Sequence, residues 1–334
     1  MQACTLILNK NGWEDTLECL ESIFRSDPIA LPVIVCDNDS GNGSLERIKA
    51  WAEGNLDAYI TIDNPLRSLS SPPVSKPIPY VEYDRESAER GGDPREGPPL
   101  ILIQNGDNLG FAGGNNVGLR YVIARGGFDY VWLLNPDTVI RADALERLIE
   151  VMRADPTIGI CGSTLLNYGD PDHVQVMGGA EYNRWLALPR HIGSGAPASC
   201  PIDQNAVASR MDFVYGASML VSSKFLAEVG LLEEDYFLYF EELDWALRAK
   251  GRFRLGYASG SIVYHREGSS LGKGAAKSPI ADHHFILNRL KVTRRFNPAA
   301  VPTVYLALLI ALLRRARRGQ WDRVKMVAGV MLSR

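Results

Sequence analysis

Short apolar runs alternate with amphipathic segments along the first part of the chain, and each apolar run ends in a polar loop. The runs 5–8 and 31–36 predict buried strands, and the helical spacing of apolar residues in 13–26 predicts a helix between them. Ser44 is expected to cap a second helix that continues to Ala52. Strands that alternate with helices favour a doubly wound, mostly parallel α/β sheet, whose ligands bind beyond the carboxyl ends of the strands.

The same alternation resumes after residue 99. Strands are predicted at 100–104, 130–134, 158–162, 174–177, 213–215, 219–221 and 253–257. Helices are predicted at 115–125, 142–154, 241–250 and through most of 281–334. We therefore expect an α/β domain over 1–280 and a basic, helical C-terminal segment over 281–334.

Residues 64–99 interrupt the alternation, because this stretch holds eight of the 19 prolines of the chain. Proline removes a backbone donor and fits poorly inside a sheet or helix. The composition predicts a flexible surface insertion without a core element, and a lid that orders on substrate binding is the alternative.

Composition narrows the class of protein. Hydrophobic residues make up 46% of the 334 residues, which excludes a wholly disordered or collagen-like chain. The five cysteines form no CxxC pair, so we expect reduced thiols in a cytoplasmic protein. The N-terminus lacks the basic region of a signal peptide.

The charge is unevenly distributed. The formal net charge is −3, yet residues 291–334 carry ten Lys and Arg and one acid. An anionic surface is the expected partner of this segment, a membrane rather than nucleic acid. The apolar run 299–313 is interrupted by Pro302 and is shorter than the roughly 20 residues of a membrane span, so we expect an interfacial helix on the inner face of the cell membrane. Packing on the catalytic domain or on a second copy of the chain is the alternative.

Two polar loops follow predicted strands. Asn135-Pro136-Asp137 provides an amide and a carboxylate that suit a hard divalent cation, although the same triplet is also typical of a turn that begins a helix. Residues 108–116 are rich in glycine and asparagine and precede a predicted helix, a pattern that suits close approach of an anionic ligand. The pattern is neither a Walker loop nor GxGxxG.

Acidic residues gather at the predicted helix start 241–250. Glu241, Glu242 and Asp244 follow an aromatic segment, where a carboxylate can have a raised pKa and act as a general base. The simpler explanation is that three acids in a first turn interact favourably with the helix dipole. His265 follows another strand and by itself indicates little.

The order of these motifs resembles the inverting family 2 glycosyltransferases of GT-A fold, and most of all their rhamnosyltransferase branch. The resemblance covers about residues 3–295 apart from the proline-rich insertion. Residues 108–116 are its most specific part, and the triplet at Asn135 and the segment 241–248 agree with it.

The resemblance implies a role for individual positions. The nucleotide-sugar would be bound by Thr5, Asn9, Asp37, Asn108, Gly110, Gly113, Asn115 and Asn135. Asp137 and His265 would ligate Mg²⁺ or Mn²⁺, with Asn135 standing where the family motif has an acid. Glu242 occupies the position of the family's catalytic Asp, which leaves Glu242, Glu241 and Asp244 as alternatives for the base.

The implied activity is a metal-dependent hexosyl transfer that inverts the anomeric configuration. The expected donor is dTDP-L-rhamnose, with UDP-galactofuranose and UDP-N-acetylglucosamine as alternatives. The expected acceptor is a glycan or a lipid-linked glycan of cell-envelope polysaccharide biosynthesis. A nucleotidyltransferase would need a basic, glycine-rich phosphate loop near the N-terminus, and a non-catalytic sugar-binding protein would not need the acids that are present here.

Overall fold

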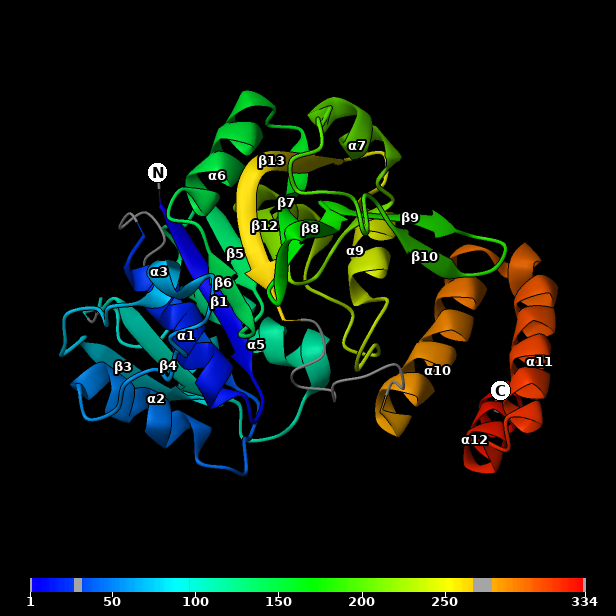
Figure 1. Cartoon of the computed structure of the whole chain (residues 1–334), viewed down its shortest axis with the longest axis horizontal. Coiled ribbons are helices and arrows are strands. Elements are labelled where there is room, and N and C mark those ends of the chain that lie inside the picture. The colour runs from blue at the N-terminus through cyan, green and yellow to red at the C-terminus, as the bar shows by residue number, and fades with distance from the viewer. Residues whose placement is uncertain (1, 27–31, 96, 267–277, 333–334) are drawn as a thin grey trace.

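The computed structural model describes residues 2–26, 32–95, 97–266 and 278–332. Within this part of the chain, ten strands form one sheet, nine of them in the order β3-β4-β2-β1-β5-β12-β7-β13-β6, with β8 paired to β7 (Figure 1). The strands that run parallel are β1 (Ala3–Asn9), β2 (Val33–Asp37), β3 (Tyr80–Asp84), β4 (Leu100–Gln104), β5 (Tyr130–Leu134), β7 (Ile158–Asn167) and β13 (Arg254–His265). The antiparallel strands are β6 (Thr138–Ile140), β8 (Asp170–Met177) and β12 (Ser218–Ser222). The expectation of a mostly parallel α/β sheet is confirmed.

Helices cover both faces of this sheet and close two hydrophobic cores. One face carries α1 (Trp13–Phe24), α2 (Ser44–Glu53) and α6 (Ala144–Ala154). The other face carries α5 (Gly110–Arg125), α7 (Gln204–Arg210), α8 (Ser223–Val229) and α9 (Glu241–Ala249). The apolar stripes of these helices are buried, for example Leu17, Leu20 and Ile23 of α1. The chain leaves β1 toward β2 on one side and returns to β5 on the other, and such a switch point opens a crevice at the carboxyl ends of the strands.

A second, antiparallel sheet extends from the catalytic body toward the C-terminal helices (Figure 1). It consists of β9 (Gly179–Asn183), β10 (Leu188–His191) and β11 (Phe213–Val214). Ala180 and Phe213 of this sheet pack with Leu243 of α9 and Val292 of the first C-terminal helix. The small sheet therefore joins the two parts of the molecule.

The C-terminal segment is helical, as expected. It comprises α10 (Pro279–Phe296), the short helix η2 (Pro298–Ala300), α11 (Val301–Arg317) and α12 (Trp321–Leu332). Ile286 and Leu290 of α10 pack against Val304 and Leu308 of α11 and against α12. Pro298–Arg317 is long and apolar enough to span a membrane by length and composition, and the length argument against a span is therefore wrong. The reason is that Pro302 lies in the first turn of α11, where proline does not interrupt a helix.

The proline-rich stretch 64–99 is more ordered than its composition indicates. It contains α3 (Arg67–Ser70), β3 and α4 (Arg85–Glu89), and β3 forms the edge of the main sheet beside β4. The prediction that it holds no core element is wrong, because its prolines flank β3 and none interrupts the strand. Buried Glu21 of α1 anchors the stretch by accepting hydrogen bonds from Val74 N at 2.8 Å and Lys76 Nζ at 3.1 Å.

Two predicted helix boundaries also require correction. Gly43, with φ 73°, occupies the cap position of α2, and Ser44 is the first helical residue, whose hydroxyl donates to Asn42 Oδ1. Helix α5 begins at Gly110 and not near residue 115, so the glycine-asparagine motif forms its first turns. Glycine has low helix propensity, which is why the sequence pattern predicts a loop there.

Candidate functional site

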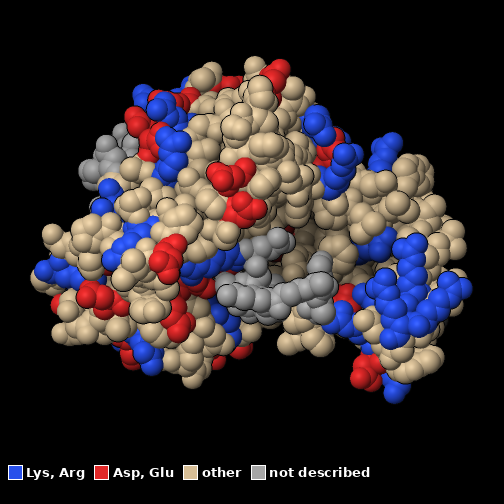
Figure 2. Space-filling view, in the orientation of Figure 1, with Lys and Arg blue, Asp and Glu red and all other residues tan. Residues whose placement is uncertain are grey.

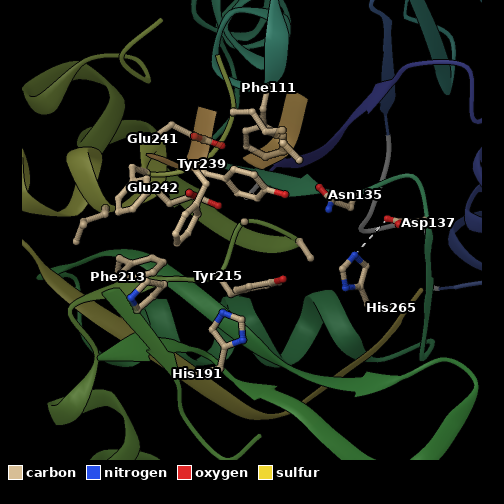
Figure 3. Close-up of a pocket in the computed structure, with 18 of the residues that line it drawn as sticks. Phe111, Asn135, Asp137, His191, Phe213, Tyr215, Tyr239, Glu241, Glu242 and His265 are labelled. Carbon is tan, nitrogen blue, oxygen red and sulfur yellow. Dashed lines mark ion pairs between the residues drawn. The ribbon is translucent and has the colours of Figure 1, made fainter. Parts of the chain in front are cut away.

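A large open cleft lies at the carboxyl ends of β1, β2 and β5, where the switch point of the sheet places it. Its volume is about 1630 Å³. Its walls come from the loops after these strands, from the small sheet, from the segment before α9 and from α10. Figure 3 shows Glu241 and Glu242 on one side of this space and Asp137 and His265 on the other.

Asp137 and His265 come together although 127 residues separate them in the chain. Their Oδ1 and Nε2 atoms are 3.3 Å apart, which is close enough for both to contact one cation, as expected of a shared site. The cause is the antiparallel pairing of β6 with β13, in which His265 is registered with Thr138. The other ring nitrogen of His265, Nδ1, donates to Gln175 Oε1 at 2.9 Å, which leaves Nε2 as the atom that faces Asp137.

This pair fits one side of a divalent cation site. Both side chains are nearly buried and both line the cleft, and a carboxylate with an imidazole is a donor set that suits Mn²⁺. Asn135 lines the same cleft. The described residues contain no group of three or more His, Cys, Asp or Glu side chains that could hold a metal ion.

The three acids at the start of α9 have different surroundings. Glu242 lines the cleft. Its carboxylate lies so close to Gly216 that a Cβ atom at position 216 would overlap with Glu242 Oε1. Burial raises the pKa of Glu242 to about 7, against which a hydrogen bond from the Gly216 backbone acts. A carboxyl with such a pKa can accept a proton near neutral pH.

Glu241 also borders the cleft, but it is buried, and its Oε2 atom has no hydrogen-bond partner in the part of the chain that the structure describes. Burial, and secondly the charge of Glu242, raises the pKa of Glu241 well above its usual value. Two adjacent carboxyls in this setting do not readily ionise together. The two carboxyls therefore titrate as a pair, in which burial favours the protonated form of Glu241.

Asp244 points away from the cleft and is held in a salt-bridge network. Its carboxylate accepts from Arg248 Nε at 2.7 Å and from Arg295 Nη1 at 2.9 Å, and it does not line the cleft. Of the acids that the sequence left open as the base, the geometry favours Glu242, and Asp244 ties α9 to α10.

The residues before α9 adopt an unusual backbone. Tyr239 and Phe240 have φ values of 69° and 75°, in the left-handed region that is unfavourable for residues other than glycine. Both line the cleft beside Glu241 and Glu242. Strained residues of this kind cluster at functional sites, where the surrounding structure holds them in place.

Among the residues expected to bind the nucleotide, some lie behind the wall of the cleft. Asn9 Nδ2 donates to Asp37 Oδ1 at 2.6 Å, and the Asp37 carboxylate also accepts from Ser40 N, so both side chains are buried in a shared network. Thr5 is buried in the middle of β1, several residues before the carboxyl end of the strand. None of Thr5, Asn9 and Asp37 lines the cleft, and their neighbours Lys10, Asn11 and Asn38 do.

The glycine-asparagine motif is only partly at the cleft. Asn108 and Gly110 line it, and Gly113 and Asn115 do not. Gly110 has φ 71° and lies so close to Phe237 that a Cβ atom would overlap with its carbonyl oxygen, while Gly113 packs against Leu109. The glycines thus allow close packing at the start of α5.

The first amides of α5 are also engaged within the protein. Leu109 N donates to Asn38 Oδ1, Gly110 N to Asn108 Oδ1 and Phe111 N to Phe237 O. The expectation that this helix start offers free donors to an anion is therefore not supported at these three amides.

The small sheet contributes cleft residues that the sequence analysis missed. Phe213 and Tyr215 come from β11 and the residue after it, and Arg190 and His191 come from β10. The Tyr215 ring contacts His191 edge-on at 4.9 Å between centroids and lies 6.3 Å from the His265 ring. No motif marks these residues in the irregular stretch after residue 167, and only their aromatic and basic character could have drawn attention to them.

Residues 84–211 match the sequence model of the family described as glycosyl transferase family 2. The chain is similar to the low-salt glycan biosynthesis hexosyltransferase Agl10 of Haloferax volcanii, with 27% identity over 151 residues, which are 45% of this chain and 46% of that protein. The match therefore spans about half the length of that relative. The chain is also similar to an N-acetylglucosaminyl-diphospho-decaprenol L-rhamnosyltransferase of Mycobacterium tuberculosis, with 25% identity over 237 residues, which are 63% of this chain and 73% of that protein.

A solved structure resembles the whole chain. The mannosyltransferase PcManGT of Pyrobaculum calidifontis, in complex with GDP-Man and Mn²⁺, superimposes with a TM-score of 0.52 at 14% identity, covering 99% of this chain and 85% of that one. At this identity the likeness establishes the fold, which is GT-A. The motifs and the fold agree with this match, and the chain is similar to glycosyl transferase family 2, whose sequence model covers residues 84–211.

Proposed function

We propose that this glycosyltransferase moves a sugar from a nucleoside diphosphate to a hydroxyl group with inversion, using Glu242 as the general base. The observation that carries the proposal is the arrangement of the cleft (Figure 3). A carboxyl with a pKa of about 7 faces the same space as the Asp137–His265 pair, with Tyr215, Tyr239 and Asn135 between them. This arrangement supports a proton acceptor and an anion-binding region at separate parts of one site.

The chemistry follows from these positions. Glu242 takes the proton from the acceptor hydroxyl while the oxygen of that hydroxyl bonds to the anomeric carbon of the donor sugar. The bond from that carbon to the diphosphate breaks on the opposite side, and the nucleoside diphosphate leaves with the bonding electrons. One displacement inverts the configuration, and no covalent enzyme intermediate forms.

Asp137 and His265 would hold the cation, and Asn135 would assist at the diphosphate. A bound Mg²⁺ or Mn²⁺ supplies Lewis-acid charge that neutralises the leaving diphosphate. The orienting bond from His265 to Gln175 keeps the imidazole lone pair on Nε2, the side that faces Asp137. Lys10 and Asn38, which line the cleft at the ends of β1 and β2, are placed to contact the donor.

The donor we propose is dTDP-L-rhamnose. The Mycobacterium relative is named as a rhamnosyltransferase with a lipid diphosphate acceptor, which supports rhamnose and a lipid-linked glycan. UDP-galactofuranose and UDP-N-acetylglucosamine remain the alternative donors. We place the enzyme in cell-envelope polysaccharide assembly, at the cytoplasmic face of the membrane, where such an acceptor resides.

The test is a panel of nucleotide-sugars assayed for hydrolysis and transfer with and without Mn²⁺. Rhamnose transfer that requires a divalent cation supports the proposal, and transfer from another donor corrects only the sugar. Mn²⁺ binding measured by electron paramagnetic resonance should weaken at least about tenfold in Asp137→Asn. Asp143→Asn, a change on the surface beside Arg141 and Arg147, is the matched control and should bind Mn²⁺ as the wild type does. Failure of every donor would overturn the proposed activity.

A further inference from the structure

A second cavity lies between α10 and the hairpin of α11 and α12, outside the cleft already described. Its volume is about 350 Å³. Apolar side chains line part of it, namely Phe285, Ile286, Leu308 and Ala311. The remainder of its lining is polar and strongly basic. Such a mixed lining suits a ligand with an anionic head and an apolar chain.

The lining of this cavity has more basic than acidic side chains. Arg289, Arg315, Arg318 and Arg323 line it, and Asp282 is the acid among its lining residues. Asp282 accepts from Arg315 Nη2 at 2.7 Å and from Arg323 Nη1 at 3.3 Å, so one carboxylate is shared by two guanidinium groups. The lining therefore carries a formal charge of about +3 at neutral pH.

Two of these arginines have donors that an added anion could use. The Nη1 atom of Arg315 is buried and has no hydrogen-bond partner among the described residues. Arg289 is 94% buried, and its Nε and Nη2 atoms donate to the Leu186 carbonyl, a neutral acceptor. A buried donor without a partner costs free energy, and an anion in the cavity would satisfy it.

The cavity is next to the catalytic cleft. Phe285 of α10 lines both spaces, and Ala281 and Ser278 of the same helix region line the cleft. The arginines at the end of α11 gather on the C-terminal helices at the right of Figure 2. A ligand in this cavity would thus be held beside the acceptor side of the cleft, at the part of the molecule that carries the basic surface.

We propose that this pocket binds the diphosphate of a lipid-linked acceptor, with the first apolar carbons of the lipid against Phe285 and Leu308. The proposal rests on the proposed function, because it assigns the acceptor of that reaction to a chemical class. Arginine forks match phosphate oxygens in geometry as well as in charge. The head group of an ordinary anionic phospholipid shares this chemistry, and the experiment separates the two.

The experiment measures binding of the full-length protein to neutral phosphatidylcholine vesicles that contain a small fraction of polyprenyl diphosphate. EDTA is present so that the divalent cation site stays empty. Arg318 is exposed and forms no ion pair with another described residue, so Arg318→Gln should fold normally, which its Tm checks. We expect this variant to bind about fivefold more weakly than the wild type.

The matched control is Arg317→Gln, which removes the same charge from the same helix but does not line the pocket. It should bind within about twofold of the wild type, because it leaves the pocket intact. Asp282→Asn should tighten binding, since it removes the acid that competes for Arg315 and Arg323. An equal loss in Arg317→Gln and Arg318→Gln would overturn the proposal in favour of general surface attraction.

A second arm replaces the polyprenyl diphosphate with phosphatidylglycerol at the same charge density. Equal binding to both vesicles would overturn the proposal in favour of a phospholipid head-group site. Glycosyl transfer to a soluble acceptor without phosphate is measured separately. Transfer without pocket-dependent binding contradicts this inference alone, and pocket-dependent binding without transfer from any donor contradicts the proposed function.

Discussion

Glu242 and Asp244 are two residues apart on the same helix, yet their environments give them different capabilities. Glu242 lies in the cleft with a pKa of about 7, whereas Asp244 is neutralised by Arg248 and Arg295. We predict that Glu242→Gln lowers kcat at least about 100-fold and leaves the Kd of the donor nearly unchanged, because the amide cannot accept the proton. Steady-state kinetics and donor titration calorimetry measure the two effects.

Asp244→Asn is the informative comparison for that prediction. It removes a charge from a structural network, so it should lower Tm while kcat of the folded fraction stays within a few-fold of the wild type. Wild-type turnover in Glu242→Gln together with loss of turnover in Asp244→Asn would assign the base to Asp244.

The raised pKa of Glu242 also predicts how activity and stability depend on pH. Activity should fall as pH drops below about 7, because the base becomes protonated. The folded state retains a proton that an unfolded glutamate releases near 4.5, so this residue lowers the free energy of unfolding as pH rises from about 4.5 to about 7. The Glu242→Gln variant does not lose this part of the free energy of unfolding, because glutamine does not titrate.

Thermal unfolding at pH 5 and pH 8 measures this difference. The Tm of Glu242→Gln relative to the wild type should be higher at pH 8 than at pH 5. A Tm difference that is the same at both pH values would mean that Glu242 titrates like an ordinary surface glutamate.

At the scale of elements, the sequence predicted those parts whose signals are local. The strand Tyr130–Leu134 and the helix that starts at Glu241 were found because a buried run or an amphipathic run ends at clear polar residues. The proximity of Asp137 and His265 was expected from the family resemblance. The β6–β13 pairing that brings them together leaves no pattern in the local sequence. Long-range pairing of this kind is decided by the whole sheet.

Other elements could not be predicted for physical reasons. The small sheet of β9, β10 and β11 is built from short strands whose side chains pack on α9 and α10, so tertiary contacts and not intrinsic propensity form it. The start of α5 was misplaced because its glycines allow close packing, of Gly110 against Phe237 and of Gly114 against Leu8, which a helix propensity does not register. The sequence also does not show that Asn9 and Asp37 lie behind the wall of the cleft while their neighbours Lys10 and Asn38 line it, an outcome that depends on which side each residue faces.

The edge of the sheet gives a prediction at this scale. Glu21 is buried and accepts from Trp51 Nε1, Val74 N and Lys76 Nζ, so it ties the proline-rich stretch to α1 and α2. Glu21→Ala leaves these buried donors without their acceptor and should destabilise the protein by about 3–5 kcal/mol. Urea unfolding measures the loss, and limited proteolysis should cut first within residues 64–99.

Glu82→Ala is the control for the edge of the sheet. It removes the exposed pair with Lys49 from β3 and should cost less than about 1 kcal/mol. Equal effects of the two variants would mean that the stretch is not anchored through Glu21.

At the scale of the whole molecule, the C-terminal helices have one face buried against the protein and another apolar face exposed. Val304, Leu308, Val327 and Val330 are buried against α10, which accounts for the packing alternative. Leu306, Leu309, Ile310 and Leu313 are exposed on another side of α11, and Arg314, Arg317 and Arg318 follow them. An exposed apolar row that ends in arginines is typical of a helix that lies in a membrane interface.

We predict that the full-length protein floats with vesicles that contain anionic lipid and not with neutral vesicles. Each basic residue near such a surface contributes about 1 kcal/mol, and added salt should release the protein because it screens this attraction. The double variant Leu309→Asp and Leu313→Asp should lose flotation, since both residues are exposed and their replacement leaves the buried contacts of α11 intact. This variant tests the surface better than a truncation after Asn297, which would expose Ile286 and Leu290. Flotation of the double variant at the wild-type level, or failure of the wild type to float, would leave α11 with a packing role only.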